Sequence, residues 1–421
     1  MKSYLVGGAV RDQLLGLPVK DRDYVVVGSS VDDMLAAGFT PVGQDFPVFL
    51  HPATKDEYAL ARTERKTAKG YKGFVFHTAH DVTIEQDLAR RDLTINAMAM
   101  EDNGDIIDPY GGQQDLSDRV LRHVTDAFAE DPVRVLRVAR FHARLADHGF
   151  SVAPETLALM RSLVDQGELE TLVAERVWAE TLQALMTGFG SVYFKTLRAC
   201  GALRVIFPEI DALYGVPQPA QWHPEIDTAV HTFMVLDQAS ALSDSGAVRF
   251  AALCHDVGKG TTPSALWPKH HGHESAGVPL VKSLCHRLKV PSDCTALALL
   301  SCEYHGHCHK VLELKPSTLA TLLASLDVQR RPERFEQFLT VCLADARGRL
   351  GFEDRAYPQA EYLRGAADAY RAVDAAHIAQ TITDKTEPAE SNQGEAIRTA
   401  IHMARIAALK TYKNTTPINS K

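Results

Sequence analysis

The sequence predicts an α+β domain at the N-terminus, followed by a chain that is helical to its end. Short runs of β-branched and aromatic residues recur up to about residue 125, and strand signals nearly vanish after Asp126. Beyond that point apolar residues recur at helical spacing between proline and glycine breaks. A chain of 421 residues is also longer than one ordinary domain, so we expect it to form several.

The expected elements follow from these local patterns. We expect strands at residues 24–27, 48–51, 58–61, 74–77 and 106–107, with a helix at 31–37. We expect further helices at residues 155–164, 174–186, 192–199, 229–240, 248–255, 274–288, 334–344 and 394–410. The proline-rich segment 214–225 is predicted to be a linker, and residues 373–394 are polar and weakly patterned.

A glycine pair and an aspartate pair lie close together near the N-terminus. Gly7 and Gly8 follow a short apolar run, and Asp21 and Asp23 stand two residues apart at the start of a β-branched run. Alternate residues of a strand point to one face, so the two carboxylates would lie side by side. Two such anions repel unless a cation lies between them, and hard oxygen ligands suit Mg²⁺. Because a glycine turn can also bring backbone N–H groups against phosphate, the pattern predicts a site for nucleotidyl transfer from a nucleoside triphosphate.

Each half of this pattern also has an ordinary structural explanation. A lone glycine pair is usually a turn, and a lone Asp-x-Asp is usually a solvated strand end. Their order and short separation favour the functional interpretation. The glycine segment matches neither the P-loop nor the dinucleotide-binding pattern, so those two classes have no support.

Five segments in the first third of the chain carry a family resemblance. They are GGAVRD at residues 7–12, KDRDYVVVG at 20–28, RRDLTINA at 90–97, DPYGGQQDL at 108–116 and EDPVRVLRVARF at 130–141. In this order they resemble the class II tRNA nucleotidyltransferases, the CCA-adding enzymes, and the related bacterial poly(A) polymerases. A later HDVGKG at 255–260 resembles the HD phosphohydrolase domain that is fused to some CCA-adding enzymes.

The resemblance covers residues 1 to about 375 and implies a fold. The implied architecture is an α+β, polymerase-β-like nucleotidyltransferase head, followed by an all-α neck, an HD domain and a tail. We expect the head, with the start of a base-selecting helix, at 1–140, a helical, tRNA-binding neck at 141–225, the HD phosphohydrolase domain at 226–330 and a helical tail at 331–421.

Four arginines recur along the helix expected after residue 131. Arg134, Arg137, Arg140 and Arg144 fall within a stripe of roughly 120° at helical spacing. Their charges repel unless an anion or carboxylates face them, so the stripe is either a surface ion-pair face or a face toward a triphosphate and its base. The resemblance implies the second explanation. The nucleotide-binding residues that it implies are Gly8, Arg11, Arg91, Asp131, Arg134, Arg137 and Arg140.

Among these residues, the resemblance gives Asp131 and Arg134 the role of a protein template for the incoming base. Cytosine and adenine each present an amino donor beside a ring-nitrogen acceptor, which a carboxylate and an arginine can match. Uracil and guanine present a carbonyl beside an N–H group, so both protein groups would be left unpaired. One Asp-Arg pair could therefore select C and A over U and G without a nucleic-acid template.

A second group of residues that could bind metal lies in the helical part of the chain. His255 and Asp256 end a predicted apolar helix, where both side chains can reach one ion. With His231 before them and Asp345 after them, they match the order His…His-Asp…Asp of the HD phosphohydrolases. Such mixed ligands suit a divalent transition metal, with Ni²⁺ as one candidate, that activates water for phosphoester hydrolysis. The alternative is a structural remnant that binds no metal.

Further histidines stand near this set. His273 matches a position that some HD enzymes use for a second metal, and His305 is a candidate ligand or phosphate contact. His305 belongs to the segment 302–309, which looks like a zinc cluster but lacks a second Cys/His pair at finger spacing. The other histidines of that segment are expected to be polar surface.

We therefore expect an enzyme that adds C, C and A to the 3′ end of tRNA from CTP and ATP, with Mg²⁺ held by Asp21 and Asp23. Its HD domain would act as a 2′,3′-cyclic phosphodiesterase, 2′-nucleotidase and phosphatase. The HD fusion and the absence of a long basic C-terminal tail favour CCA addition over poly(A) synthesis. Two alternatives are a phosphohydrolase whose head only binds nucleotide and a non-catalytic RNA-binding protein; the complete aspartate and arginine sets argue against both.

Composition bears on partners and location. The net charge of −8 argues against a general nucleic-acid binder but allows a local basic patch, for which residues 62–72 are a candidate. Seven cysteines without a CxxC pair fit a reduced cytoplasm. No apolar run approaches the length of a membrane span, so we expect no membrane partner. The sequence leaves both a monomer and a homodimer open.

Overall fold

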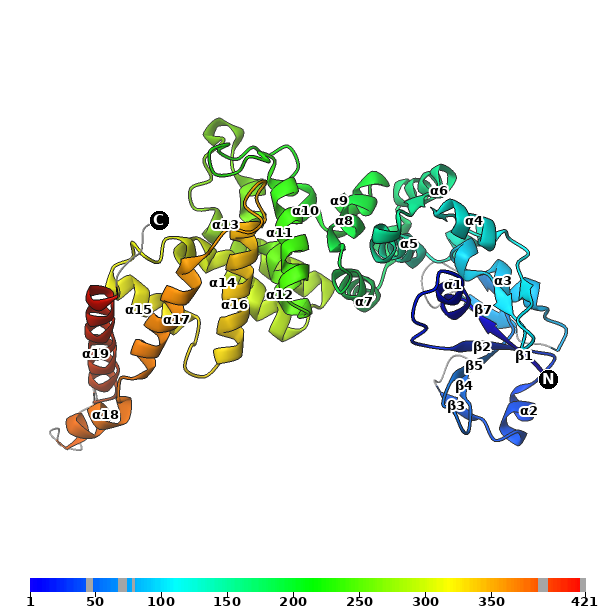
Figure 1. Ribbon diagram of the computed structural model, residues 1–421, viewed down its shortest axis with the longest axis horizontal. Helices are drawn as coiled ribbons and strands as arrows, with labels where there is room; N and C mark the ends of the chain where they lie inside the picture. Colours follow the sequence, from blue (N-terminus) through cyan, green and yellow to red (C-terminus); the bar gives the residue numbers. More distant parts are fainter. Residues whose placement is uncertain (43–47, 67–73, 78–79, 385–392, 417–421) are drawn as a thin grey trace. The chain divides into compact units, whose positions relative to one another are not determined.

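The computed structural model describes residues 1–42, 48–66, 74–77, 80–384 and 393–416 (Figure 1). Its contacts divide the chain into two compact units, Met1–Ile206 and Phe207–Lys421. Most of the basic segment 62–72 lies outside the residues whose side chains are described. Within the described ranges, no helix has the length and apolar character needed to cross a membrane.

The first unit is built around a mixed sheet whose described strands run in the order β3-β4-β5-β2-β1-β8-β9. Strand β1 (Lys2–Val6) pairs antiparallel with β2 (Asp23–Val27), and β2 pairs parallel with β5 (Glu57–Leu60). The register sets Val6 opposite Asp23, so this aspartate lies across from the residue that precedes Gly7. The other strands are β3 (Thr40–Val42), β4 (Val48–Leu50), β6 (Thr63–Lys66), β7 (Phe74–His77), β8 (Ala99–Met100), β9 (Ile106–Ile107), β10 (Val120–Leu121) and β11 (Ser151–Val152).

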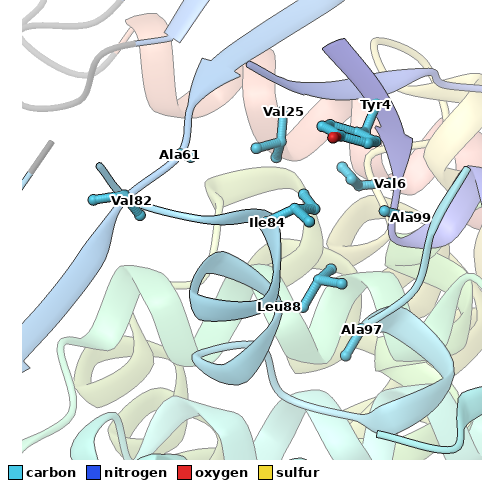
Figure 2. Close-up of a cluster of buried hydrophobic side chains, with 9 residues drawn as sticks. All are labelled: Tyr4, Val6, Val25, Ala61, Val82, Ile84, Leu88, Ala97 and Ala99. Carbon is cyan, nitrogen blue, oxygen red and sulfur yellow. The ribbon is translucent and has the colours of Figure 1, made fainter. Parts of the chain in front are cut away.

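Apolar side chains of β1 and β2 pack against helix α3 (Ile84–Ala89) to form a core on one side of the sheet (Figure 2). Val6 and Val25 contribute from the sheet, and Leu88 of α3 is fully buried among them. Helix α3 begins at a capping box formed by Thr83, which satisfies N–H groups of its first turn. This packing fixes the position of the polar segment that directly follows α3.

The rest of the first unit is mainly helical. Helix α5 (Val133–Arg144) buries its apolar face against α7 (Ala174–Leu185) and α8 (Gly190–Ala199). Its arginines recur at helical spacing and therefore share one face of the helix, from which Arg140 also contacts α7. The remaining helices of the unit are α1 (Gly8–Leu14), α2 (Val31–Ala36), α4 (Gly112–Asp118), α6 (Pro154–Asp165) and α9 (Ala202–Ile206).

The second unit is formed by helices (Figure 1). At its centre, α11 (Thr228–Leu242), α12 (Gly246–Cys254), α14 (Ser292–His309) and α16 (Pro332–Arg347) pack against one another. The other helices are α10 (Pro208–Asp211), α13 (His273–Leu288), α15 (Pro316–Ser325), α17 (Pro358–Arg371), α18 (Ala375–Thr383) and α19 (Gln393–Thr415).

The predicted change from an α+β head to a helical remainder is confirmed, since the described strands all lie before residue 153. Three segments have local structure that their sequence patterns did not indicate. The glycine pair is not an isolated turn, because α1 begins at Gly8. The segment 373–394, described as polar and weakly patterned, contains the short helix α18, whose residues are all at least partly exposed. The segment 302–309 is the last part of α14, where its cysteines and histidines lie at helical spacing.

Candidate functional sites

A cleft of about 770 Å³ opens in the first unit. It is lined by residues at the ends of the central strands β1 and β2 and by residues of α1, α5 and α7. The head residues predicted from the sequence all line it: Gly8, Arg11, Asp21, Asp23, Arg91, Asp131, Arg134, Arg137 and Arg140. Four of the five motifs therefore meet in one polar cavity, while residues 108–116 do not line it.

Gly7 makes the turn from β1 into α1 with a positive φ of 68°. A Cβ atom at this position would lie 2.8 Å from Nη1 of Arg91, so a glycine is needed for the arginine to approach. The Gly7 N–H donates to the carbonyl of Met98 at 3.2 Å. This N–H group therefore forms a hydrogen bond within the protein, whereas the sequence predicted a backbone N–H group free to bind phosphate.

Asp21 and Asp23 both line the cleft, but they do not share a strand. Strand β2 begins at Asp23, and Asp21 lies in the irregular segment before it, so the expectation of a common strand face was wrong. The two carboxylates still affect each other. Partial burial raises the pKa of Asp23 and the charge of Asp21 adds to this rise, while Arg91 opposes it. Such a donor set of two adjacent carboxylates fits a hard divalent cation.

Carboxylates from other elements face the arginine stripe of α5. The Nε of Arg137 donates to Asp92 at 2.7 Å, and the Nε of Arg140 donates to Glu180 of α7 at 2.5 Å. Arg144 pairs with Asp12 of α1 at 2.7 Å. Although burial works to raise the pKa of Asp92, the charge of Arg137 and the hydrogen bonds from Arg137 and Asn96 together outweigh it and keep that pKa well below its usual value. The stripe thus combines both expected roles, because it is ion-paired and also lines the cleft.

Asp131 and Arg134, the pair predicted to read the base, are held by different partners. Arg134 donates to the carbonyls of Ala127 and Arg90, at 2.7 and 2.6 Å. Asp131 instead receives two hydrogen bonds from Arg176 in the first turn of α7, one to each carboxylate oxygen, at 3.2 and 2.6 Å. Sequence reasoning missed Arg176. The only available signal was its spacing of one helical turn from Glu180, which suggests one face of a helix but no partner.

Arg11 is almost wholly buried beneath this cleft. Its guanidinium donates to the carboxylate of Asp12 at 2.8 Å and to the side-chain oxygen of Asn96 at 2.6 Å. Burial lowers the pKa of Arg11, but the charge of Asp12 opposes this shift. Arg11 therefore connects α1 with the 90–97 motif.

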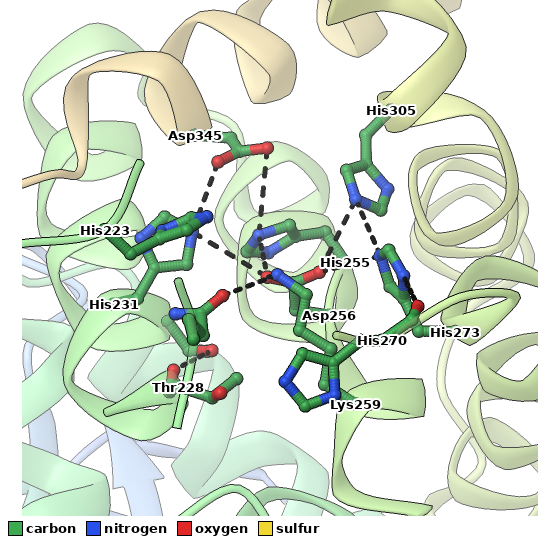
Figure 3. A network of polar contacts seen from close by, with 12 residues as sticks. His223, Thr228, His231, His255, Asp256, Lys259, His270, His273, His305 and Asp345 are labelled. Atoms are coloured by element: carbon green, nitrogen blue, oxygen red, sulfur yellow. Dashed lines mark hydrogen bonds and ion pairs between the residues drawn. The ribbon is translucent and has the colours of Figure 1, made fainter. Parts of the chain in front are cut away.

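The second unit brings together the four predicted metal ligands at its centre (Figure 3). His231 lies on α11, His255 and Asp256 follow α12, and Asp345 lies on α16; all four are buried. The Nε2 of His231 is 3.2 Å from Asp345, and the Nε2 of His255 is 3.2 Å from Asp256. The neighbouring helices α11 and α12 and the distant helix α16 therefore supply one compact cluster of nitrogen and oxygen atoms.

His273 and His305 extend this cluster on the other side of Asp256 (Figure 3). Their Nε2 atoms lie 3.3 and 3.5 Å from Oδ1 of Asp256, whereas His255 approaches Oδ2. The two oxygens of one carboxylate thus face two separate sets of histidines. Both sets have ligand atoms close enough to hold a metal ion.

The backbone fixes the tautomers of these histidines. The Nδ1 atoms of His231, His255, His273 and His305 lie 2.7–3.0 Å from the carbonyl oxygens of Gly348, Ala252, His270 and Ser301. A carbonyl only accepts, so each Nδ1 carries a proton, and the Nε2 of each ring is the atom directed toward a carboxylate. Such contacts are repulsive unless a cation or a proton lies between them. The Nε2 atoms of His231 and His255 and Oδ1 of Asp256 are buried without a hydrogen-bond partner among the described residues, which fits a divalent metal.

Other side chains hold the cluster in place, and sequence reasoning missed them. Lys259 donates to Asp256 at 2.6 Å, and the Nε2 of His309 lies 2.6 Å from Asp345. Glu225 places one oxygen 3.0 Å from Nδ1 of His231. Hydrogen bonds from His223 and His231 outweigh burial and keep the pKa of Glu225 well below its usual value. His309 was expected to be polar surface; it lies one helical turn after His305 and so points toward the same centre.

The chain is similar to three known domain families. Residues 3–122 match the poly A polymerase head domain, residues 149–214 match the probable RNA and SrmB-binding site of polymerase A, and residues 228–328 match the HD domain. The first two matches lie within or extend just beyond the first unit, and the third lies in the second unit.

Full-length relatives and solved structures are also similar to it. Multifunctional CCA proteins of Pseudomonas syringae pv. syringae and Thioalkalivibrio sulfidiphilus are each 57% identical, covering 99% and 98% of this chain and 100% and 99% of theirs. The fold is similar to that of a CCA-adding enzyme with ATP, with TM-score 0.60, 19% identity, and coverage of 96% of this chain and 86% of that one. It is also similar to the Bacillus stearothermophilus CCA-adding enzyme in complex with CTP, with TM-score 0.61, 22% identity, and coverage of 98% of this chain and 93% of that one. The Thermotoga maritima CCA-adding enzyme complexed with tRNA is similar too, with TM-score 0.60, 18% identity, and coverage of 99% of this chain and 88% of that one.

Proposed function

Since the chain belongs to the family of multifunctional CCA proteins, we propose that it adds C, C and A to the 3′ end of tRNA from CTP and ATP, releasing pyrophosphate. The observation that carries this proposal is the cleft of the first unit. It gathers two adjacent carboxylates, a stripe of arginines and an oriented Asp131 in one cavity of about 770 Å³. Relatives named for CCA addition support this activity over poly(A) synthesis.

The residues of the cleft have two proposed roles in nucleotidyl transfer, which are binding the metal and triphosphate and recognising the base. Asp21 and Asp23 would hold Mg²⁺, which lowers the pKa of the attacking 3′-hydroxyl and balances charge on the leaving pyrophosphate. Arg91 and Arg137 line the same cavity and supply positive charge for a triphosphate. Asp131 accepts from the amino group of C or A, and Arg134 donates to the adjacent ring nitrogen. U and G present the opposite polarity, so they leave both groups unpaired.

Purified protein, a tRNA that lacks its 3′ CCA, labelled CTP and ATP, and Mg²⁺ test this activity. We expect three nucleotides to be added, and we expect Asp23→Asn to reduce addition by about 10²-fold or more. Asp165→Asn, an exposed residue of the same unit, is the matched control. A wild-type protein that adds only long runs of A would support the poly(A) alternative. Binding of tRNA without any addition would support the RNA-binding alternative.

We also propose that the second unit is a metal-dependent phosphohydrolase acting on 2′,3′-cyclic and 2′-phosphates. His231, His255, Asp256 and Asp345 would hold a divalent transition metal such as Ni²⁺, which supplies an activated water when bound. His273 and His305 would add a second position on the other oxygen of Asp256. The partnerless buried atoms of the cluster support metal binding here rather than a structural remnant.

Paired assays on one preparation test this second activity. Hydrolysis of a 2′,3′-cyclic nucleotide is measured with Ni²⁺, Co²⁺, Mn²⁺ or Mg²⁺, and CCA addition is measured with Mg²⁺. We expect His255→Ala to abolish hydrolysis and to retain addition, because the two sets of residues lie in separate compact units. If the wild-type protein hydrolyses no phosphoester with any of these metals, the HD domain is structural. Loss of both activities in a folded His255→Ala protein would contradict two independent sites.

The setting in which the protein acts is also a proposal. We propose that it works in the cytoplasm, which the seven buried, free cysteines support because a reducing compartment keeps thiols in that state.

A further inference from the structure

We infer that Arg176 determines base selectivity by holding the carboxylate of Asp131 in the orientation that reads the amino group of C and A. This inference rests on the proposed nucleotide addition. Arg176 would be a positioning residue, acting through Asp131 rather than on the base itself.

The contact between the two residues is bidentate. The Nη1 and Nη2 of Arg176 donate to Oδ1 and Oδ2 of Asp131 at 3.2 and 2.6 Å. A planar guanidinium in this geometry fixes the plane of the carboxylate as well as its position. The backbone N–H of Val133 also donates to Oδ1, at 3.2 Å, so Oδ2 has the fewer protein donors. Because each carboxylate oxygen can accept about two hydrogen bonds, Oδ2 retains capacity for an amino donor.

Both members of the pair line the cleft and remain partly accessible. The side chains of Asp131 and Arg176 are 20% and 30% exposed. They stand beside Arg134, whose guanidinium is anchored to two backbone carbonyls. Each half of the template is therefore held by the protein before a nucleotide binds. Pre-orientation of this kind is what discriminates between bases of opposite polarity, since a mobile carboxylate could turn away from U or G and avoid the unpaired contact.

Helix α7 links this pair to the arginine stripe. Arg176 and Glu180 stand one helical turn apart on α7 and therefore share a face. Glu180 accepts from Arg140 at 2.5 Å and lies 3.7 Å from Arg137. The same face of α7 thus orients an acceptor for the base and the cations near the triphosphate, so its position relative to α5 sets the geometry of both.

The test compares Arg176→Ala with wild type by the ratio of kcat/KM for CTP to that for UTP, on a tRNA that lacks its CCA end. We expect this ratio to fall about tenfold or more, the factor that one charge-assisted hydrogen bond contributes. Arg176→Lys keeps the positive charge but loses the bidentate geometry of the guanidinium. Its CTP/UTP ratio should therefore lie between those of wild type and Arg176→Ala. Arg161→Ala removes an exposed arginine of α6 that donates to Ala199, and it should leave the ratio unchanged.

A double variant separates positioning from a direct contact. If Arg176 acts through Asp131, then Asp131→Ala/Arg176→Ala should have the same ratio, within about twofold, as Asp131→Ala alone. A further fall in the double variant would overturn the inference, because Arg176 would then contact the base independently. An unchanged ratio in a folded Arg176→Ala or Arg176→Lys protein, at any loss of rate, would also overturn it. A wild-type protein that adds no nucleotide would instead contradict the proposed function.

Discussion

Asp92 offers a direct test of how the cleft is held together. Its side chain is 6% exposed and accepts from Arg137 at 2.7 Å, from Asn96 at 3.0 Å and from the Leu93 N–H at 2.9 Å. We expect Asp92→Asn to destabilise the first unit. Removing one partner of a buried ion pair costs about 3–5 kcal/mol. Arg137 is 37% exposed and also lies 3.7 Å from Glu180, which the substitution leaves in place. We therefore expect the free energy of unfolding to fall by a smaller amount, about 2–3 kcal/mol.

The same substitution should change how stability depends on pH. The pKa of Asp92 is lowered in the folded state, so the carboxylate stabilises the fold fully above its unfolded pKa of about 3.9. Below that value the unfolded chain takes up the proton first, and the contribution is lost as the pH falls toward the lower folded pKa. The difference in stability between wild type and Asp92→Asn should therefore be constant from pH 5 to 7 and shrink below about pH 4.

Urea unfolding followed by the fluorescence of Trp178 measures this difference in the full chain, because Trp178 is a buried residue of α7 in the first unit. Replacing Trp222 and Trp267 by phenylalanine removes the signal of the second unit. Asp165→Asn is the control, since Asp165 is 62% exposed and its ion pair with Arg204 spans 3.7 Å. A stability loss no larger than that of the control would refute the reasoning, as would a loss that stays constant down to pH 3.

Three further variants test the two sites. Arg134→Ala should slow addition and reduce discrimination against UTP and GTP about tenfold, measured as ratios of kcat/KM; full discrimination at reduced rate would contradict the template role. Glu225→Gln should weaken metal binding in the second unit about tenfold or more, as measured by equilibrium dialysis with Ni²⁺. Glu313→Gln, at an exposed position, is the control. Unchanged affinity for Ni²⁺ would exclude support of His231 by Glu225. Chelation should lower the unfolding temperature of wild type but not of His255→Ala, because an ion bound only by the folded state stabilises it; equal responses would argue against these ligands.

The local part of both sites could be predicted from the sequence. Asp131 and Arg134 lie within one helical turn, and His255 and Asp256 are adjacent, so secondary structure alone brings each pair together. The order of motifs along the chain then indicated which pairs belong to one site. The structure brings these residues together as expected, although their roles remain predictions.

The partners that hold these residues could not be predicted in the same way. Arg176 is separated from Asp131 by 45 positions. Nothing in the two local patterns indicates their contact, which depends on how α7 packs against α5. His309 looked like part of a surface histidine run, because only the continuous helix α14 sets it one turn from His305. Glu225 fell in a proline-rich segment that suggested a linker, yet its carboxylate is buried behind His231.

The two sites differ in how their charges are balanced without ligand, and this difference predicts how each unit depends on metal. In the cleft, Asp92, Glu180 and Asp12 pair with Arg137, Arg140 and Arg144 of α5 within the protein. A guanidinium has five N–H donors, so these contacts leave capacity for phosphate, and we expect the first unit to need no bound ion for its stability. In the second unit, buried carboxylates face the Nε2 atoms of histidines whose Nδ1 atoms bond to the backbone. Lys259 and Arg349 are the Lys and Arg side chains in contact with Asp256 and Asp345 among the described residues. The second unit should therefore lose stability when its metal is removed, whereas the Trp178 transition of the first unit should not change.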